Sequence, residues 1–103
     1  MNQANIDDLF TDIDSIITNQ AYLDLIQNAY LPVCKDSTVL EIAPYRGWHT
    51  RLILKQDPKS ITAVEPDIRH NKFLELPNVE LVNQDIFHYL ETPHEFDVVV
   101  CFG

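Results

Sequence analysis

Residues 37–67 read STVLEIAPYRGWHTRLILKQDPKSITAVEPD, and this stretch decides the fold. Residues 38–42 form a short run of apolar and β-favouring residues, too short for a helix and abruptly ended by Pro44, so they predict a buried strand. The chain must turn after Pro44. Gly47 supplies backbone freedom at the end of that turn.

A helix and a second strand follow the turn. Trp48 begins an apolar stripe with helical spacing, which predicts a helix to about Gln56. Residues 61–64 form another apolar run, closed by Glu65. A loop between a strand and a helix brings unpaired backbone N–H groups to the carboxyl edge of a parallel sheet, and a carboxylate ending the next strand can accept hydrogen bonds from a ribose diol. The arrangement therefore suits an adenosine-containing ligand.

Four segments resemble the first signature segments of the class I S-adenosylmethionine-dependent methyltransferases: VLEIAPYRGWHT, AVEPD, NVELVNQDIF and EFDVVVCFG. In that family a strand ending in an acid precedes a Gly-x-Gly-x-Gly loop. The resemblance makes Glu41 the acid and Gly47 the third glycine, while Ala43 and Tyr45 occupy the first two glycine positions. The loop is therefore degenerate, and Tyr45 places a large side chain where the backbone approaches the methionine part of the cofactor.

The same resemblance assigns further residues to S-adenosylmethionine. It gives the ribose hydroxyls to Glu65, which is followed by Pro66. It gives the adenine amino group to Asp85, with Ile86 packing on the ring. Phe102, just after the fourth strand, would stand at the lip of the cofactor site. The resemblance identifies no catalytic residue and no methyl acceptor, because the family's substrate determinants lie largely after the fourth strand.

Each of these acids has an alternative role. Glu65 could be a strand-end acid that faces solvent, and Asp85 could cap the turn that follows it. Glu41 lies in a predicted buried strand, where an unpaired carboxylate is costly. We therefore expect Glu41 to bond the backbone amides of its own loop or to contact the amino group of the ligand. The four histidines share no metal-ligand spacing, so we predict no metal site.

The predicted fold class is α/β, a Rossmann-like parallel sheet in the order 3-2-1-4 with flanking helices, as an incomplete methyltransferase domain. We interpret residues 1–103 as a single truncated domain, with N-terminal helices in residues 1–34 and the cofactor-binding half in residues 35–103. The third strand, residues 79–82, suits an edge position. The fourth, residues 96–101, is left at an open edge, which further strands of a longer protein or a second copy of the chain would cover. We favour the longer protein and expect the isolated chain to be inactive.

Short helices are predicted outside the central stretch. Two precede the sheet, and their apolar positions are Ile13, Ile16 and Ile17 in the first and Tyr22, Leu25, Ile26 and Ala29 in the second, with Asn19 as a possible cap and Pro32 beyond the end. A short polar helix is predicted around residues 69–72, and a helical turn at residues 86–90. These helices are expected to cover the sheet.

Composition limits the classes of function. The chain has 103 residues, 46% of them hydrophobic, which is a globular composition. Its formal net charge of −9 argues against autonomous binding to nucleic acid or membranes. Cys34 and Cys101 are too few for a disulfide framework, so we expect both to be reduced core thiols. No signal segment or apolar run of membrane length is present, which predicts a cytoplasmic protein.

Two other functions stay open. A non-catalytic scaffold or interaction module could keep this fold, and the residues at the first two glycine positions are what such a module would tolerate. A nicotinamide dinucleotide enzyme also uses a strand, glycine loop, helix and acid, but its loop needs a glycine near the position of Tyr45. Fold analogy does not choose the methyl acceptor, which could be a small molecule, a protein or an RNA.

Overall fold

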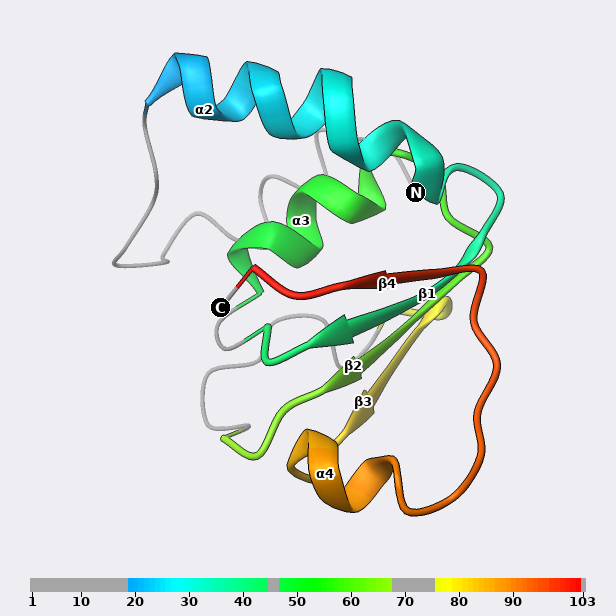
Figure 1. The fold of residues 1–103 in the computed structure, drawn as a ribbon. Helices are drawn as coiled ribbons and strands as arrows, with labels where there is room; N and C mark the ends of the chain where they lie inside the picture. The colour runs from blue at the N-terminus through cyan, green and yellow to red at the C-terminus, as the bar shows by residue number, and fades with distance from the viewer. Residues whose placement is uncertain (1–18, 45–46, 68–75, 103) are drawn as a thin grey trace.

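A four-stranded parallel sheet forms the centre of the chain in a computed structural model that describes residues 19–44, 47–67 and 76–102. The sheet has the order β3-β2-β1-β4, which confirms the predicted order. Its strands are β1 Thr38–Ile42, β2 Ser60–Val64, β3 Val79–Val82 and β4 Val98–Val100. All of their carboxyl ends meet at one edge of the sheet, on the side of the C-terminus (Figure 1).

Short helical segments connect and cover these strands. They are α2 Gln20–Leu25, the π-helical η1 Ile26–Tyr30, the 3-10 helix η2 Leu31–Cys34, α3 Trp48–Leu54 and α4 Ile86–Tyr89. Figure 1 shows α2, η1 and η2 as an outer layer over α3, while α4 lies across the sheet from them. The helix predicted from Trp48 ends two residues earlier than expected, and the fourth strand is shorter than residues 96–101.

The segment before the sheet corrects one sequence interpretation. The Asn19 carboxamide accepts a hydrogen bond from the Tyr22 amide at 3.0 Å, which confirms the predicted cap. The predicted stripe is confirmed at Ile26, which lies in the core, and at Tyr22, which packs against it. It is wrong at Leu25 and Ala29, which are exposed, and Leu23 packs against the core instead. The π-helical turn at residues 26–30 takes Ala29 off the 3.6-residue period on which the prediction relies. The predicted helices at Ile13–Ile17 and residues 69–72 lie outside the described residues.

The main core lies between α3 and one face of the sheet. Strand residues that point to this face include Val39, Ile61 and Ala63, and they pack against Leu52 and Ile53 of α3. All five are fully buried. A leucine or isoleucine in such a position contributes about 1.5–3 kcal/mol through burial. Trp48, which begins the predicted apolar stripe of this helix, is buried as such a stripe predicts.

The opposite face of the sheet is covered less completely. Leu40 and Val64 are buried there, but Val99 of β4 is 58% exposed and Phe87 of α4 is 82% exposed. An open groove of about 710 Å³ runs between β1, β4 and residues 90–97. Val98 and Val100 of β4 pack against the main core. Because side chains alternate along a strand, Val99 between them points to the opposite, less covered face.

Two further predictions concern cysteines and membranes. Cys34 is buried as expected, whereas Cys101 is exposed, so the prediction of a core thiol is wrong there. Cys101 follows the end of the short strand β4 and therefore leaves the sheet. Within residues 19–44, 47–67 and 76–102, no helix has the length and apolar character needed to cross a bilayer.

Candidate functional site

The loop after β1 keeps the backbone shape that glycines usually permit. Gly47 has φ 86°, a left-handed conformation that glycine adopts readily, and its amide donates to the Pro44 carbonyl at 2.9 Å. Ala43, at the first glycine position of the family pattern, also has a positive φ, of 53°. This conformation costs a non-glycine residue about 1–2 kcal/mol. Tyr45, the second substituted position, lies outside the described residues.

Glu41 is buried beneath this loop, with 2% of its surface exposed. The Thr50 hydroxyl, on α3, donates a hydrogen bond to Glu41 Oε1. Burial raises the pKa of Glu41 to about 7, against the lowering effect of this bond, and the charge of Glu65 contributes to the rise. We expected loop amides or a ligand as partners. The partner found is Thr50, because the Glu41 side chain points toward α3.

Glu65 follows β2 at the same edge of the sheet. It is 4% exposed, so it is not the solvent-facing acid of the alternative interpretation. Its Oε2 accepts a hydrogen bond from the Asp67 amide at 2.9 Å. Its own amide donates to the Val82 carbonyl at 3.0 Å, which fixes it between the ends of β2 and β3. Pro66 is exposed beside it.

Asp85 and Ile86 stand where β3 leads into α4. The Asp85 carboxylate accepts a hydrogen bond from the His88 amide at 2.8 Å, so it caps α4 as one sequence interpretation proposed. Asp85 is exposed and Ile86 is half-buried. The cap holds the carboxylate at the end of β3, and its assignment to adenine stays a prediction.

An aromatic cluster joins three distant parts of the chain at this edge; we call Tyr22, His49 and Phe102 the aromatic cluster. Tyr22 Oη and His49 Nε2 lie 2.8 Å apart, within hydrogen-bonding distance. The rings of His49 and Phe102 are stacked, with centroids 4.3 Å apart and planes 9° from parallel. Burial lowers the pKa of His49 to about 4, so the imidazole is neutral near pH 7.

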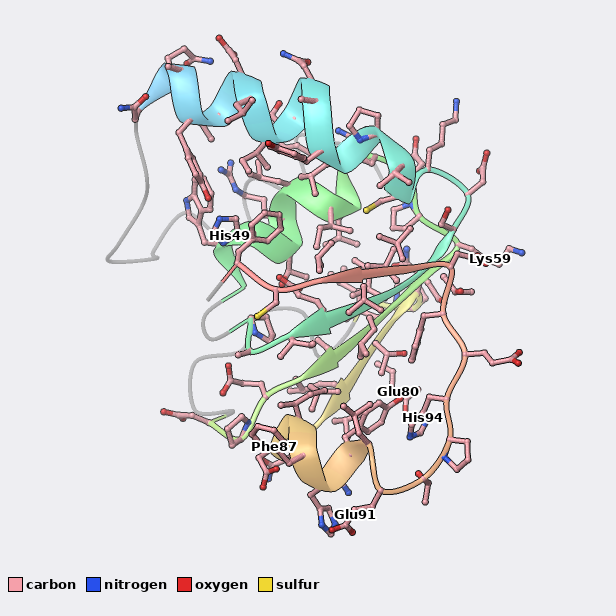
Figure 2. All side chains as sticks on the ribbon, in the orientation of Figure 1. His49, Lys59, Glu80, Phe87, Glu91 and His94 are labelled. Atoms are coloured by element: carbon pink, nitrogen blue, oxygen red, sulfur yellow. The ribbon has the colours of Figure 1, made fainter. Side chains whose placement is uncertain are left out.

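Figure 2 shows where His49, the central residue of the aromatic cluster, lies. His49 lies near the carboxyl edge of the sheet, whereas Lys59 lies at the opposite end of the strands. Phe87, Glu91 and His94 belong to the region around α4 and the loop after it, away from His49. In the described part of the chain, no three His, Cys, Asp or Glu side chains are grouped to hold a metal ion.

The candidate residues follow the strand order along this edge. Asp85 follows β3, Glu65 follows β2, the loop with Ala43 and Gly47 follows β1, and Phe102 follows β4. Neighbouring strands lie about 4.8 Å apart, so this row spans roughly 14 Å. The structure therefore sets all of the described candidate positions in one line, with Glu41 beneath its middle.

Comparison with solved structures identifies the fold, although no family model matches the chain. A "putative methyltransferase" from Escherichia coli superposes with a TM-score of 0.67 and 18% identity, over 84% of this chain and 54% of that protein. A "putative RNA methyltransferase" from Pyrococcus horikoshii gives a TM-score of 0.64 and 11% identity, over 97% of this chain and 59% of that one. The chain has the methyltransferase fold.

A third structure with the methyltransferase fold is described as a "putative methyltransferase complexed with SAH". It matches with a TM-score of 0.60 and 19% identity, over 78% of this chain and 23% of that protein. The chain thus spans about half the length of the Escherichia coli protein and a smaller share of this one.

Sequence reasoning missed three residues at this edge of the methyltransferase fold. Thr50 lies three positions after Gly47, and its place on the sheet-facing side of α3 was the available signal. His49 shares no metal-ligand spacing with the other histidines, so the sequence indicates no role for it. Tyr22 belongs to the predicted helix stripe, and nothing in the linear sequence pairs it with His49.

Proposed function

We propose that this chain is the cofactor-binding part of an S-adenosylmethionine-dependent methyltransferase whose acceptor is a small molecule, a protein or an RNA. The observation that carries the proposal is the buried carboxylate of Glu65, held at the carboxyl end of β2 beside the loop that follows β1. A carboxylate at this place suits a ribose diol, because each of its oxygens accepts hydrogen bonds.

The row of residues fits the cofactor in the order of its covalent parts. Asp85 and Ile86 would receive the adenine, and Glu65 the ribose. The loop at Ala43 and Gly47 would allow the backbone to approach the part beyond the ribose, since both positions have left-handed φ angles. Phe102 would lie at the far end. Glu41 would support the loop from below.

When bound, the cofactor supplies an electrophilic methyl group, which the acceptor takes by in-line displacement at carbon. In the proposed arrangement, residues of this chain bind and orient the cofactor. Glu65 fixes the ribose, and the partly buried Phe102 helps to exclude water from the reacting end. The raised pKa of Glu41, about 7, would lower the negative charge beneath the loop by keeping part of this carboxyl protonated near neutral pH. A group that removes a proton from the acceptor is not assigned.

The wider organisation of the protein is part of the same proposal. We infer that residues 1–34 and 35–103 belong to one domain of a longer protein, because the chain spans 54% of the Escherichia coli structure. The open edge of β4 would then receive further strands, and a second copy of the chain is the alternative partner. We also propose a cytoplasmic location. The net charge of −9 argues against autonomous nucleic-acid binding.

Calorimetric titration of the purified chain with S-adenosylhomocysteine tests the proposal. The Glu65→Gln variant should bind about ten- to a hundredfold more weakly, because hydrogen bonds to a charged group contribute about 1.5–3 kcal/mol. Glu80→Gln is the matched control, since Glu80 is an exposed carboxylate within β3 and away from the row. Circular dichroism would verify that each variant is folded.

The outcomes separate the candidate functions. Binding that Glu65→Gln weakens about ten- to a hundredfold and Glu80→Gln preserves supports the cofactor site. A folded chain that binds no S-adenosylhomocysteine contradicts the proposal and favours the scaffold. Tighter binding of NAD would favour the nicotinamide alternative.

A further inference from the structure

The aromatic cluster lies where the charged part of the proposed cofactor would lie, an argument that rests on the proposed function. The sulfur is bonded to the ribose on the side away from the adenine. With Glu65 at the ribose, the strand order β2-β1-β4 places the sulfur toward β1 and β4. Phe102 follows β4, and its ring is stacked on His49, two residues after Gly47.

The aromatic cluster is suited to a cation. Aromatic faces attract positive groups through the ring quadrupole, and this is how proteins recognise onium ligands. The neighbouring Trp48 ring already contacts a cation of the chain itself, because the Arg51 guanidinium lies 5.1 Å from its centroid. Phe102 is only partly buried, so part of this residue stays accessible at the carboxyl edge.

Hydrogen bonding and packing hold the aromatic cluster in place without adding charge. Tyr22 fixes the imidazole of His49 through the 2.8 Å contact, and His49 in turn supports one face of Phe102. The neutral imidazole would not repel a cation, whereas a protonated one would. As a base, a group with a pKa of about 4 is too weak to take a proton efficiently near neutral pH.

We propose that Tyr22, His49 and Phe102 form a neutral aromatic wall that contacts the sulfonium of the cofactor, with Phe102 as the contacting residue and Tyr22 and His49 as positioning residues. The wall discriminates between the two states of the cofactor. S-Adenosylmethionine carries the positive sulfonium and S-adenosylhomocysteine carries a neutral thioether, so the wall favours the methyl donor over the product.

The ratio of the two dissociation constants tests this inference. Both ligands are titrated into the wild-type chain, Phe102→Leu and Phe87→Leu. Phe102→Leu removes one aromatic face, so it should weaken the binding of S-adenosylmethionine about fivefold relative to that of S-adenosylhomocysteine. Phe87→Leu is the matched control, because Phe87 is 82% exposed and lies on α4. It should leave the ratio unchanged.

A second variant preserves the packing of Phe102. Phe102→pentafluorophenylalanine keeps the shape of the ring but reverses its quadrupole, so it should lower the preference at least as much as Phe102→Leu. A preference that falls in both variants supports the wall. Equal weakening of both ligands, or an unchanged ratio, overturns it while leaving the cofactor site intact. Failure of the folded wild-type chain to bind either ligand overturns the proposed function and the wall together.

Discussion

Replacement of Glu41 by glutamine should remove a pH dependence from the stability of the fold. The carboxyl is 2% exposed, and its pKa rises from the ordinary 4.5 to about 7 chiefly because burial disfavours the charged form. The folded state therefore retains a proton that the unfolded state releases. The stability associated with the protonated acid is fully present below pH 4.5 and is lost as the pH rises through about 7. The loss amounts to about 3 kcal/mol, because each pKa unit corresponds to about 1.4 kcal/mol.

Urea unfolding at a series of pH values measures this loss. Trp48 is the only tryptophan and is buried, so its fluorescence reports unfolding directly. The difference in unfolding free energy between Glu41→Gln and wild type should shift by about 3 kcal/mol in favour of the variant from below pH 4.5 to above pH 7. A constant cost of burying the amide cancels in this comparison. Glu95→Gln, at an exposed position, is the control. A difference that is constant with pH, or that shifts in favour of wild type, would refute the reasoning.

Two further predictions concern the loop and its support. Ala43→Gly should stabilise the chain by about 0.5–1 kcal/mol in urea unfolding, because glycine accepts the left-handed φ of 53°. Ala29→Gly, in an exposed helical position, is the control and should destabilise the chain by a similar amount. The opposite pattern would contradict the backbone strain assigned to Ala43. Thr50→Val should destabilise the chain by about 1–3 kcal/mol, since it removes a donor from a buried carboxyl. That cost should grow as the pH rises through about 7, and it should shrink in the Glu41→Gln background; additive effects of the two substitutions would rule out the coupling.

Local patterns predicted much of the fold. The runs at residues 38–42 and 61–64 became β1 and β2, because short apolar runs between turn residues suit buried parallel strands. The strand order came from a family resemblance and was confirmed. Errors occurred where local signals are weakest, in the helix before the sheet and at the ends of α3 and β4. There the π-helical turn and the register with β1 decided the outcome.

Local sequence is enough to predict the strands, the turn at Gly47 and the positions of the acids that follow strands, because these depend on neighbours a few residues apart. Which side chains meet depends on the packing of distant segments. Thr50 bonds Glu41 because α3 packs over β1. Tyr22 contacts His49, and His49 stacks on Phe102, because three segments converge at one edge. The raised pKa of Glu41 and the lowered pKa of His49 have the same origin. Both follow from burial, which is created when the whole chain packs together.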